Sequence, residues 1–324
     1  MRPRARRKTW MIVLIVFLLL VVVYSGFQVL EPIVFPADRG DNIPAESRII
    51  VRDGVEYYPR QDITVLLMMG IDQPGPAESS GAYNNAGAAD MLAVAVFDET
   101  KESYTVLTIN RDTMTEVPVL GPGGRPAGTA KQQLALAHTY GSGLTDSAEN
   151  TRNAVSALLY NFPIDYYISV RTDAIAIFND AVGGVKVTVT DDFSKVDDTI
   201  PMGEVTLKGQ QAVRYVQSRS GVGDQLNLSR MKRQEQYMQG FVQSVRSASA
   251  GWELKAYDKA ADYLVTDCSQ KVMSNLLSRY GEYTFNGTLT FEGQNVHGGT
   301  FMEFYPDENA MDAIILNLLY APRK

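Results

Sequence analysis

Apolar residues form short runs in the first half of the chain, and glycine or charged residues stop each run. Residues 63–69 end at Gly70, and residues 91–97 and 103–110 are separated only by the charged segment 98–102. Runs of this length between turn residues predict buried β-strands, and the short separation predicts a hairpin. We therefore expect three successive strands at the start of the folded region.

Further along the chain, apolar spacing of the helical kind alternates with short β-branched runs. Helices are predicted at 130–140, 147–162, 173–182, 208–218, 229–246, 253–264, 270–280 and 307–320. Strands are predicted at 164–170, 185–190 and 283–292, with a short one at 47–51. Mixed elements of this kind predict an α/β fold whose sheet is covered on both faces.

The N-terminus predicts a membrane anchor. Residues 10–30 contain no charge, and five cations precede them within residues 1–9. A helix of that length spans about 30 Å, and basic residues before it place the N-terminus in the cytoplasm. We expect a cytoplasmic tail at 1–9, one transmembrane helix at 10–30, a juxtamembrane linker at 31–60 and an extracellular catalytic domain at 61–324. A cleaved signal peptide is the alternative, although no small-residue cleavage site follows residue 30.

Charge and composition exclude several classes of protein. Without the five N-terminal cations, 25 basic residues face 37 acidic ones, which leaves −12 on the outer part. A protein of this net charge is not expected to bind nucleic acid, because such binding depends on a cationic surface. Two histidines and one cysteine leave little for a zinc site or a serine–histidine hydrolase, and they allow no intrachain disulfide.

Charged side chains follow or precede each of the three predicted strands. Asp72 follows the first, Asp90 precedes the second, and Arg111 and Asp112 follow the third. In an antiparallel meander these side chains would meet at one end of the sheet. Two carboxylates together with phosphate oxygens are a usual set of ligands for Mg²⁺. An adjacent arginine can donate hydrogen bonds to phosphoryl oxygens. The alternative is that the aspartates are turn residues and that residues 111–112 form a local ion pair.

A second cluster is locally basic, in contrast to the acidic net charge of the outer part of the chain. The segment 214–233 carries five cations against one acid, Asp224; the cations are Arg214, Arg219, Arg230, Lys232 and Arg233. Arg230 and Arg233 fall in the first turn of a predicted helix, where cations oppose the helix dipole unless an anion binds there. A solvated basic helix face is the competing interpretation.

Eight short motifs occur in a recognisable order. They include Thr108-Ile-Asn-Arg-Asp-Thr113, Leu136-Ala-His-Thr-Tyr-Gly141 and Ala181-Val-Gly-Gly-Val185, and the others lie at 65–72, 89–91, 163–167, 209–219 and 230–234. Together, after a single predicted membrane span, they resemble the LytR–CpsA–Psr family of bacterial cell-envelope proteins. The resemblance covers residues 60–246.

The resemblance implies a three-layer α-β-α fold around a central mixed β-sheet. It also implies magnesium-assisted transfer of a glycan phosphate from a polyprenyl-pyrophosphate carrier to a peptidoglycan hydroxyl. Asp72 and Asp90 match metal-associated aspartates. The residues that match pyrophosphate-binding positions or the helix-start motif are Arg111, Arg219, Arg230, Arg233, Gln234 and Asp224.

Three positions depart from the family pattern. Ala88 and Gln217 stand where arginine is frequent, and Lys131 is displaced by about two positions from the family's lysine. We expect Arg111, Arg219 and Asp90 to be catalytic, and Asp90 or Asp112 to accept the proton of the attacking hydroxyl. Lys131 is expected to bind pyrophosphate, and Arg214 or Arg125 is a possible substitute for the missing arginines.

Two other functions remain open on the sequence. A pyrophosphatase would use the same residues with water as the acceptor. A membrane-tethered scaffold would bind lipid phosphate through the same arginines without turnover. The glycopolymer expected for the transferase is of the teichoic acid or capsule type.

Overall fold

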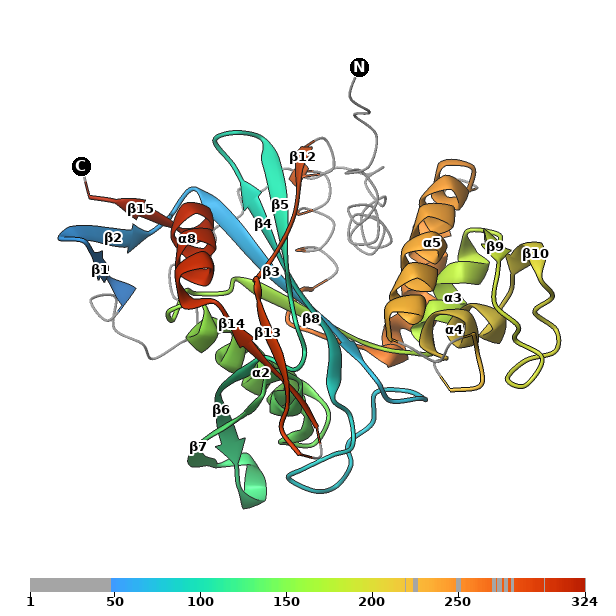
Figure 1. The fold of residues 1–324 in the computed structure, drawn as a ribbon, viewed down its shortest axis with the longest axis horizontal. Coiled ribbons are helices and arrows are strands. Elements are labelled where there is room, and N and C mark those ends of the chain that lie inside the picture. The colour runs from blue at the N-terminus through green and yellow to red at the C-terminus, as the bar shows by residue number, and fades with distance from the viewer. Residues whose placement is uncertain are drawn as a thin grey trace.

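A six-stranded mixed sheet forms the centre of the fold (Figure 1). The computed structural model describes residues 48–218, 220–223, 227–248, 252–269, 272, 276, 279–280, 283–299 and 301–323. The strand order is β11-β8-β3-β4-β5-β12. The strands are β3 (Ile63–Ile71), β4 (Ala89–Asp98), β5 (Ser103–Ile109), β8 (Tyr166–Arg171), β11 (Leu264–Thr266) and β12 (Thr284–Thr290).

The three predicted strands are confirmed as an antiparallel meander. β3 pairs with β4, β4 pairs with β5, and β8 and β12 add in parallel to the two sides of this meander. The hairpin between β4 and β5 is closed by the backbone N–H of Lys101, which donates to Asp98 Oδ1 at 2.9 Å. Mixed strand directions agree with the predicted mixed sheet.

Alternation along β3 divides the interior into two cores. Leu66 and Met68 point into one core, and Leu67 and Met69 point into the other, as the two-residue period of a strand requires. All four side chains are almost fully buried. A strand that is apolar on both faces belongs at the centre of a layered fold, which explains the unbroken apolar run.

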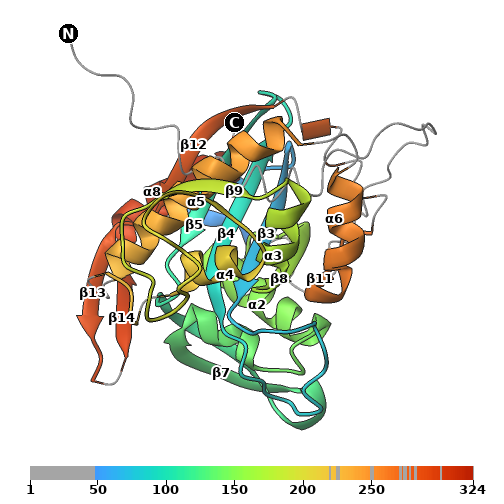
Figure 2. The same ribbon diagram turned by 90° about the vertical axis from the view of Figure 1, so that its right-hand side faces the viewer.

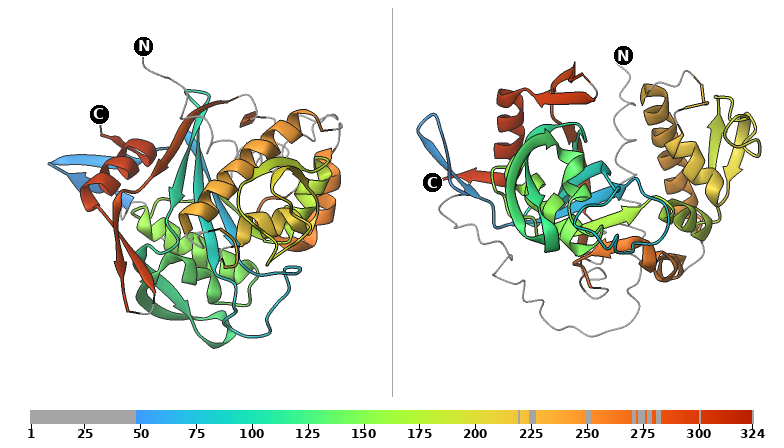
Figure 3. Two further views of the ribbon diagram at one scale, coloured as in Figure 1. Left: turned by 45° about the vertical axis from the view of Figure 1, so that its right-hand side comes forward. Right: turned by 90° about the horizontal axis from the view of Figure 1, so that it is seen from below.

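Helices cover both faces of the sheet (Figures 1 and 2). The first core lies beneath α3 (Ala174–Ala181), α4 (Gln210–Gln217), α5 (Asn227–Arg246) and α6 (Trp252–Ala260). The strands β9 (Val185–Val189) and β10 (Gly203–Leu207) form a ribbon beside them. The second core lies beneath α2 (Thr145–Leu158) and α8 (Glu308–Leu319). Figure 3 shows these two groups on opposite sides of the sheet.

Two more antiparallel ribbons border the second core. One is formed by β6 (Met114–Leu120) and β7 (Pro126–Gln133), and it leads into the 3-10 helix η3 (Leu134–Thr139). The other is formed by β13 (Gly293–His297) and β14 (Met302–Pro306). Both ribbons contribute to the second core, through Val117 and Phe304 respectively.

The helix predicted at 130–140 is wrong. Its first part is β7, which pairs with β6 in the register Glu116↔Lys131, and its second part is η3. Lysine, glutamine and alanine favour a helix locally, but pairing with a neighbouring strand overrides this preference. The predicted helix 253–264 likewise stops at Ala260, and the chain continues through a 3-10 turn, η4 (Ala261–Tyr263), into β11.

Part of the predicted linker is folded. Residues 50–59 form β1 (Ile50–Arg52) and β2 (Val55–Pro59), and β2 also pairs with β15 (Tyr320–Pro322). Asp53 and Gly54 both have positive φ angles, 50° and 77°, at the turn between them. An Asp-Gly pair is a strong hairpin signal because it accepts this conformation, so the sequence did contain the information.

The predicted membrane segment 10–30 lies outside the described residues. Within the part of the chain that the structure describes, no helix combines the length and apolar character needed to cross a membrane. Most of the predicted helix 270–280 also lies outside the described residues.

Candidate active site

The meander brings four of the predicted site residues to one end of the central sheet. Asp72 follows β3 directly, and its N–H donates to Ala88 O at 3.1 Å. Asp90 is the second residue of β4, and Arg111 and Asp112 follow β5 by two and three residues. The expected convergence at one sheet edge is therefore observed for these residues.

A β-bulge sets the direction of Asp90. Gly70 pairs with Met91 and Ile71 pairs with Ala89, so Asp90 is the extra residue in β4. Bulges re-aim side chains and are frequent beside active sites. A Cβ on Gly70 would lie 3.1 Å from Met91 Cβ, which shows how closely the two strands approach at this point.

Arg111 lies between two carboxylates. Its Nη1 forms an ion pair with Asp90 Oδ1, and its Nε lies 3.5 Å from Asp112 Oδ1. About one third of the Arg111 side chain is exposed (32%), so the guanidinium is accessible to a ligand while its orientation is fixed. Asp112 is held in turn by Gln133, whose Nε2 donates to Asp112 Oδ1 at 2.8 Å.

Burial and mutual repulsion perturb these carboxyl groups. Burial raises the pKa of Asp90; the positive charge of Arg111 opposes this rise, the negative charge of Asp72 adds to it, and the charge of Arg230 opposes it. Burial also raises the pKa of Asp112 against the effect of Arg111. Perturbed carboxylates next to a positioned cation are typical of functional sites. These effects also place Asp72, Asp90, Arg111 and Arg230 within one electrostatic environment.

Gln217 contributes a contact that the sequence did not predict. It is the last residue of α4, and its Nε2 donates to Asp72 Oδ1 at 3.1 Å. On the sequence, this position was notable only because the family frequently has arginine there. The structure shows that a neutral amide here still contacts the carboxylate, although it adds no positive charge for an anion.

Arg233 is a buried anchor between α5 and α4. Its side chain is 5% exposed, its Nη1 lies 2.6 Å from Asp191 Oδ2, and its Nε and Nη2 donate to the carbonyls of Tyr215 and Ser218. Gln234 Nε2 donates to Val216 O at 3.0 Å. These bonds satisfy carbonyls at the C-terminal end of α4, which lack partners within the helix. The two side chains therefore hold the segment that leads to residue 219.

The remaining predicted residues either form no hydrogen bond or ion pair with the four residues at the end of the sheet or lie outside the described residues. Lys131 is exposed on β7, with its Nζ 5.7 Å from the centre of the Tyr305 ring. Arg214 pairs with Asp197 at 2.7 Å. Arg219 and Asp224 lie outside the described residues, so their predicted roles stay predictions.

Two buried polar groups were missed by the sequence reasoning. Arg171, at the end of β8, is only 4% exposed, and among the described residues no hydrogen bond or ion pair to its side chain is found. Nearby His138 is fully buried, and its Nδ1 lies 2.8 Å from Gly87 O. Burial, together with the charge of Arg171, lowers the pKa of His138 to about 4. Only the position of His138 in the 136–141 motif pointed to it.

The donor set at this end of the sheet fits Mg²⁺ held jointly with phosphate. Among the described residues no group of three or more His, Cys, Asp and Glu is placed to hold a metal ion. Asp72 and Asp90 supply two carboxylates; burial raises the pKa of Asp90, and the negative charge of Asp72 adds to this rise. Mg²⁺ is commonly bound by one or two carboxylates, with phosphate and water completing the coordination.

Comparisons with known proteins identify the family of the chain. The model of the LytR_cpsA_psr family matches residues 44–317. The polyisoprenyl-teichoic acid–peptidoglycan teichoic acid transferase TagU of Halalkalibacterium halodurans is 29% identical over 249 residues, 76% of this chain and 72% of that protein. The transferase TagV of Bacillus subtilis is 25% identical over 319 residues, 95% of this chain and 76% of that protein.

The fold is also shared with a solved structure. The crystal structure of B. subtilis TagV superimposes with a TM-score of 0.58 at 24% identity, covering 80% of this chain and 96% of that one. Most of the present chain lies within the family match, including every described residue of the site. The chain therefore belongs to the LytR–CpsA–Psr family.

Proposed function

We propose that this protein transfers a glycopolymer of the teichoic acid or capsule type from a polyprenyl-pyrophosphate carrier to a hydroxyl of peptidoglycan, releasing polyprenyl phosphate. The observation that carries the proposal is the placement of Arg111 between Asp90 and Asp112 at one end of the sheet. The names of the TagU and TagV relatives, which describe teichoic acid transfer to peptidoglycan, support the choice of donor and acceptor.

The chemistry assigned to the site is positioning and charge stabilisation. As the bond to the leaving polyprenyl phosphate breaks, negative charge spreads over the phosphoryl oxygens. Arg111 donates to these oxygens, and Arg230 adds positive potential, as its effect on Asp90 indicates. A single donor of this kind lowers the activation free energy by roughly 2–4 kcal/mol. Arg219 is assigned the same role by its match to the family motif.

Magnesium belongs to the proposal as a cofactor. Asp72 and Asp90 would hold the ion, and when bound it would neutralise charge on the pyrophosphate. Gln217 orients Asp72 through its hydrogen bond. The bulge at Asp90 and the ion pair to Arg111 fix the second carboxylate.

Asp112 is the base that we assign to the attacking hydroxyl. Burial raises its pKa, which makes the carboxylate a better proton acceptor. Gln133 donates a hydrogen bond to Asp112 Oδ1, which anchors the carboxylate through that oxygen. The other carboxylate oxygen is assigned to the proton. Asp90 is less suited because its Oδ1 is engaged by Arg111 and its remaining capacity is assigned to the metal.

The proposed location follows from the N-terminal segment. The charge-free residues 10–30 would anchor the protein in the cell membrane once, with the basic tail in the cytoplasm and the catalytic domain outside. In that arrangement the lipid carrier and the cell wall are both within reach of the site. The acidic composition continues to disfavour nucleic acid as a partner.

Product analysis tests the function. Full-length protein in lipid nanodiscs would be incubated with a lipid-linked glycopolymer and Mg²⁺, with and without peptidoglycan. The proposal expects polyprenyl phosphate release and covalent attachment of the glycopolymer to peptidoglycan. Release into water alone, unchanged by peptidoglycan, would instead support a pyrophosphatase. Tight lipid binding without any release would support a scaffold.

A further inference from the structure

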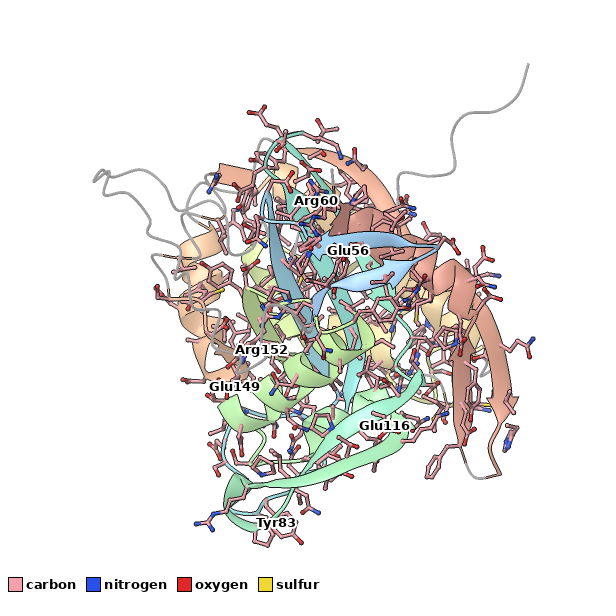
Figure 4. The ribbon with its side chains drawn as sticks, turned by 90° about the vertical axis from the view of Figure 1, so that its left-hand side faces the viewer. Glu56, Arg60, Tyr83, Glu116, Glu149 and Arg152 are labelled. Carbon is pink, nitrogen blue, oxygen red and sulfur yellow. The ribbon has the colours of Figure 1, made fainter. Side chains whose placement is uncertain are left out.

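The β13–β14 hairpin carries exposed apolar side chains, and its backbone contacts the candidate site at Asp112. Of the ten large hydrophobic residues that are most exposed in the described part of the chain, four lie in this hairpin: Val296, Phe301, Met302 and Tyr305. Exposed apolar side chains that gather on one face commonly mark binding surfaces, and two of the four, Val296 and Tyr305, share a face of the hairpin. Figure 4 shows the hairpin beside β6, on which Glu116 is labelled.

One face of the hairpin combines an aromatic ring with polar groups. Gln294 pairs with Tyr305, and Val296 pairs with Glu303, so these four side chains share a face. Phe304 points the opposite way into the second core. Lys131 lies over the Tyr305 ring, and Tyr305 Oη donates to Glu303 Oε2 at 2.7 Å. We call Lys131, Gln294, Val296, Glu303 and Tyr305 the outer hairpin face.

The backbone of the hairpin is connected to Asp112 by hydrogen bonds. Gln133 Nε2 donates both to Asp112 Oδ1 at 2.8 Å and to Met302 O at 2.7 Å. The N–H of Phe304 donates to Asp112 O at 2.8 Å. Lys131 and Gln133 lie two residues apart on β7 and therefore on the same side of that strand. Through Gln133 and Lys131, β7 therefore links the assigned base to the outer hairpin face.

The hairpin and the donor-binding side chains lie on different sides of the sheet. Gln217 and Arg230 come from α4 and α5, which cover the first core, whereas Phe304 anchors the hairpin in the second core. In phosphoryl transfer the attacking and leaving oxygens are roughly in line across phosphorus. An acceptor must therefore approach from the side opposite the leaving polyprenyl phosphate, which is the side of Asp112 and the hairpin.

We propose that the outer hairpin face is the subsite that binds the acceptor saccharide of peptidoglycan and delivers its hydroxyl to Asp112. A sugar ring has an apolar C–H face, which stacks on Tyr305, and polar edges, which match Gln294, Glu303 and Lys131. The charged groups disfavour insertion of this face into a membrane, since burying charge in lipid is costly. The inference rests on the proposed function, whose acceptor it locates.

The test separates acceptor binding from donor chemistry. Full-length protein in nanodiscs would be assayed with lipid-linked glycopolymer and a soluble disaccharide-peptide fragment of peptidoglycan. Tyr305→Ala should raise KM for the fragment on the order of tenfold, whereas the KM for the lipid-linked glycopolymer should be unchanged. Tyr305→Phe keeps the ring and should stay within about twofold of the wild type.

Tyr83→Ala is the matched control, because Tyr83 is similarly exposed (45%, against 38% for Tyr305) and lies away from the hairpin (Figure 4). It should leave the KM for the fragment unchanged. An unchanged KM in Tyr305→Ala would overturn the inference. So would an equal rise in the KM for the lipid-linked glycopolymer, which would assign the hairpin to the donor or the membrane.

A direct titration keeps the inference independent of turnover. If the wild type releases no polyprenyl phosphate at all, the proposed function fails, and binding of the fragment alone decides the role of the hairpin. Wild-type protein should bind the fragment about tenfold more tightly than Tyr305→Ala. Equal affinity of the two proteins would contradict the inference.

Discussion

Arg111 is fixed to Asp90 by an ion pair formed where a β-bulge leaves Asp90 as an extra residue. The same guanidinium faces Asp112 through Nε, 3.5 Å from Oδ1. Its planar fork is therefore directed by two carboxylates that come from different segments. A guanidinium can hold both contacts at once, while an ammonium group is a single point charge.

Arg111→Lys tests this geometry. We expect the variant to lose roughly tenfold to a hundredfold in kcat, because the charge remains but the fork that contacts both carboxylates and the phosphoryl oxygens is lost. The KM for the lipid-linked donor should change less than kcat. Steady-state release of polyprenyl phosphate measures both values, and a kcat equal to that of the wild type would contradict the role of the fork.

Removal of either metal-associated carboxylate should raise the magnesium requirement. In Asp72→Asn and Asp90→Asn, the Mg²⁺ concentration for half-maximal activity should increase about tenfold or more, because one charged ligand is lost. Asp312→Asn is the control, since Asp312 pairs with Arg52 near β1 and β2. Activity that persists in the wild type after chelation would show that magnesium is not required.

Loss of the buried Arg233 should lower the free energy of unfolding more than loss of an arginine in an exposed ion pair. Arg233→Ala removes a buried side chain that donates to the partly exposed Asp191 and to two carbonyls, and we expect a loss of roughly 1–3 kcal/mol in the free energy of unfolding. Arg323→Ala, which removes an exposed ion pair with Glu56, should leave the free energy of unfolding almost unchanged, because solvent screens exposed ion pairs. Denaturant titration compares the two variants, and similar losses would contradict the assigned anchor role.

The lowered pKa of buried His138 predicts that the protein loses stability on acidification. Its folded-state pKa is lowered to about 4 from the ordinary 6.5, so the unfolded chain takes up a proton first as the pH falls. The stabilisation is fully present above pH 6.5 and is lost progressively towards pH 4, by about 2–3 kcal/mol. In His138→Gln the dependence of unfolding free energy on pH over this interval should be weaker. An equal dependence in both proteins would exclude His138 as the source.

The sheet edge could be predicted because local sequence signals and topology agreed there. Residues 63–69, 91–97 and 103–110 are short apolar runs with clear stops, and an antiparallel meander then places Asp72, Asp90 and Arg111 together. The resemblance to the family supplied the order of the remaining motifs. These parts needed no knowledge of long-range side-chain contacts.

Other parts depend on contacts that the sequence does not show. Residues 130–133 have helical propensity but pair with β6, and tertiary pairing overrides such preferences. Arg233 was expected at pyrophosphate, yet its partners are Asp191 and the end of α4. The role of Gln133 as a bridge between Asp112 and β14 follows only from the distant segment 302–306 returning to the site. No local pattern indicates such a meeting.

Comparison of Arg111→Ala with Arg214→Ala in the transfer assay tests the central claim most directly. Both changes remove an arginine in an ion pair, but Arg214 is half exposed and pairs with Asp197 outside the cluster formed by Asp72, Asp90, Arg111 and Asp112. The site described above predicts a fall in kcat on the order of 10² to 10³ for Arg111→Ala and a change of less than about twofold for Arg214→Ala. Full transfer activity in Arg111→Ala would contradict it.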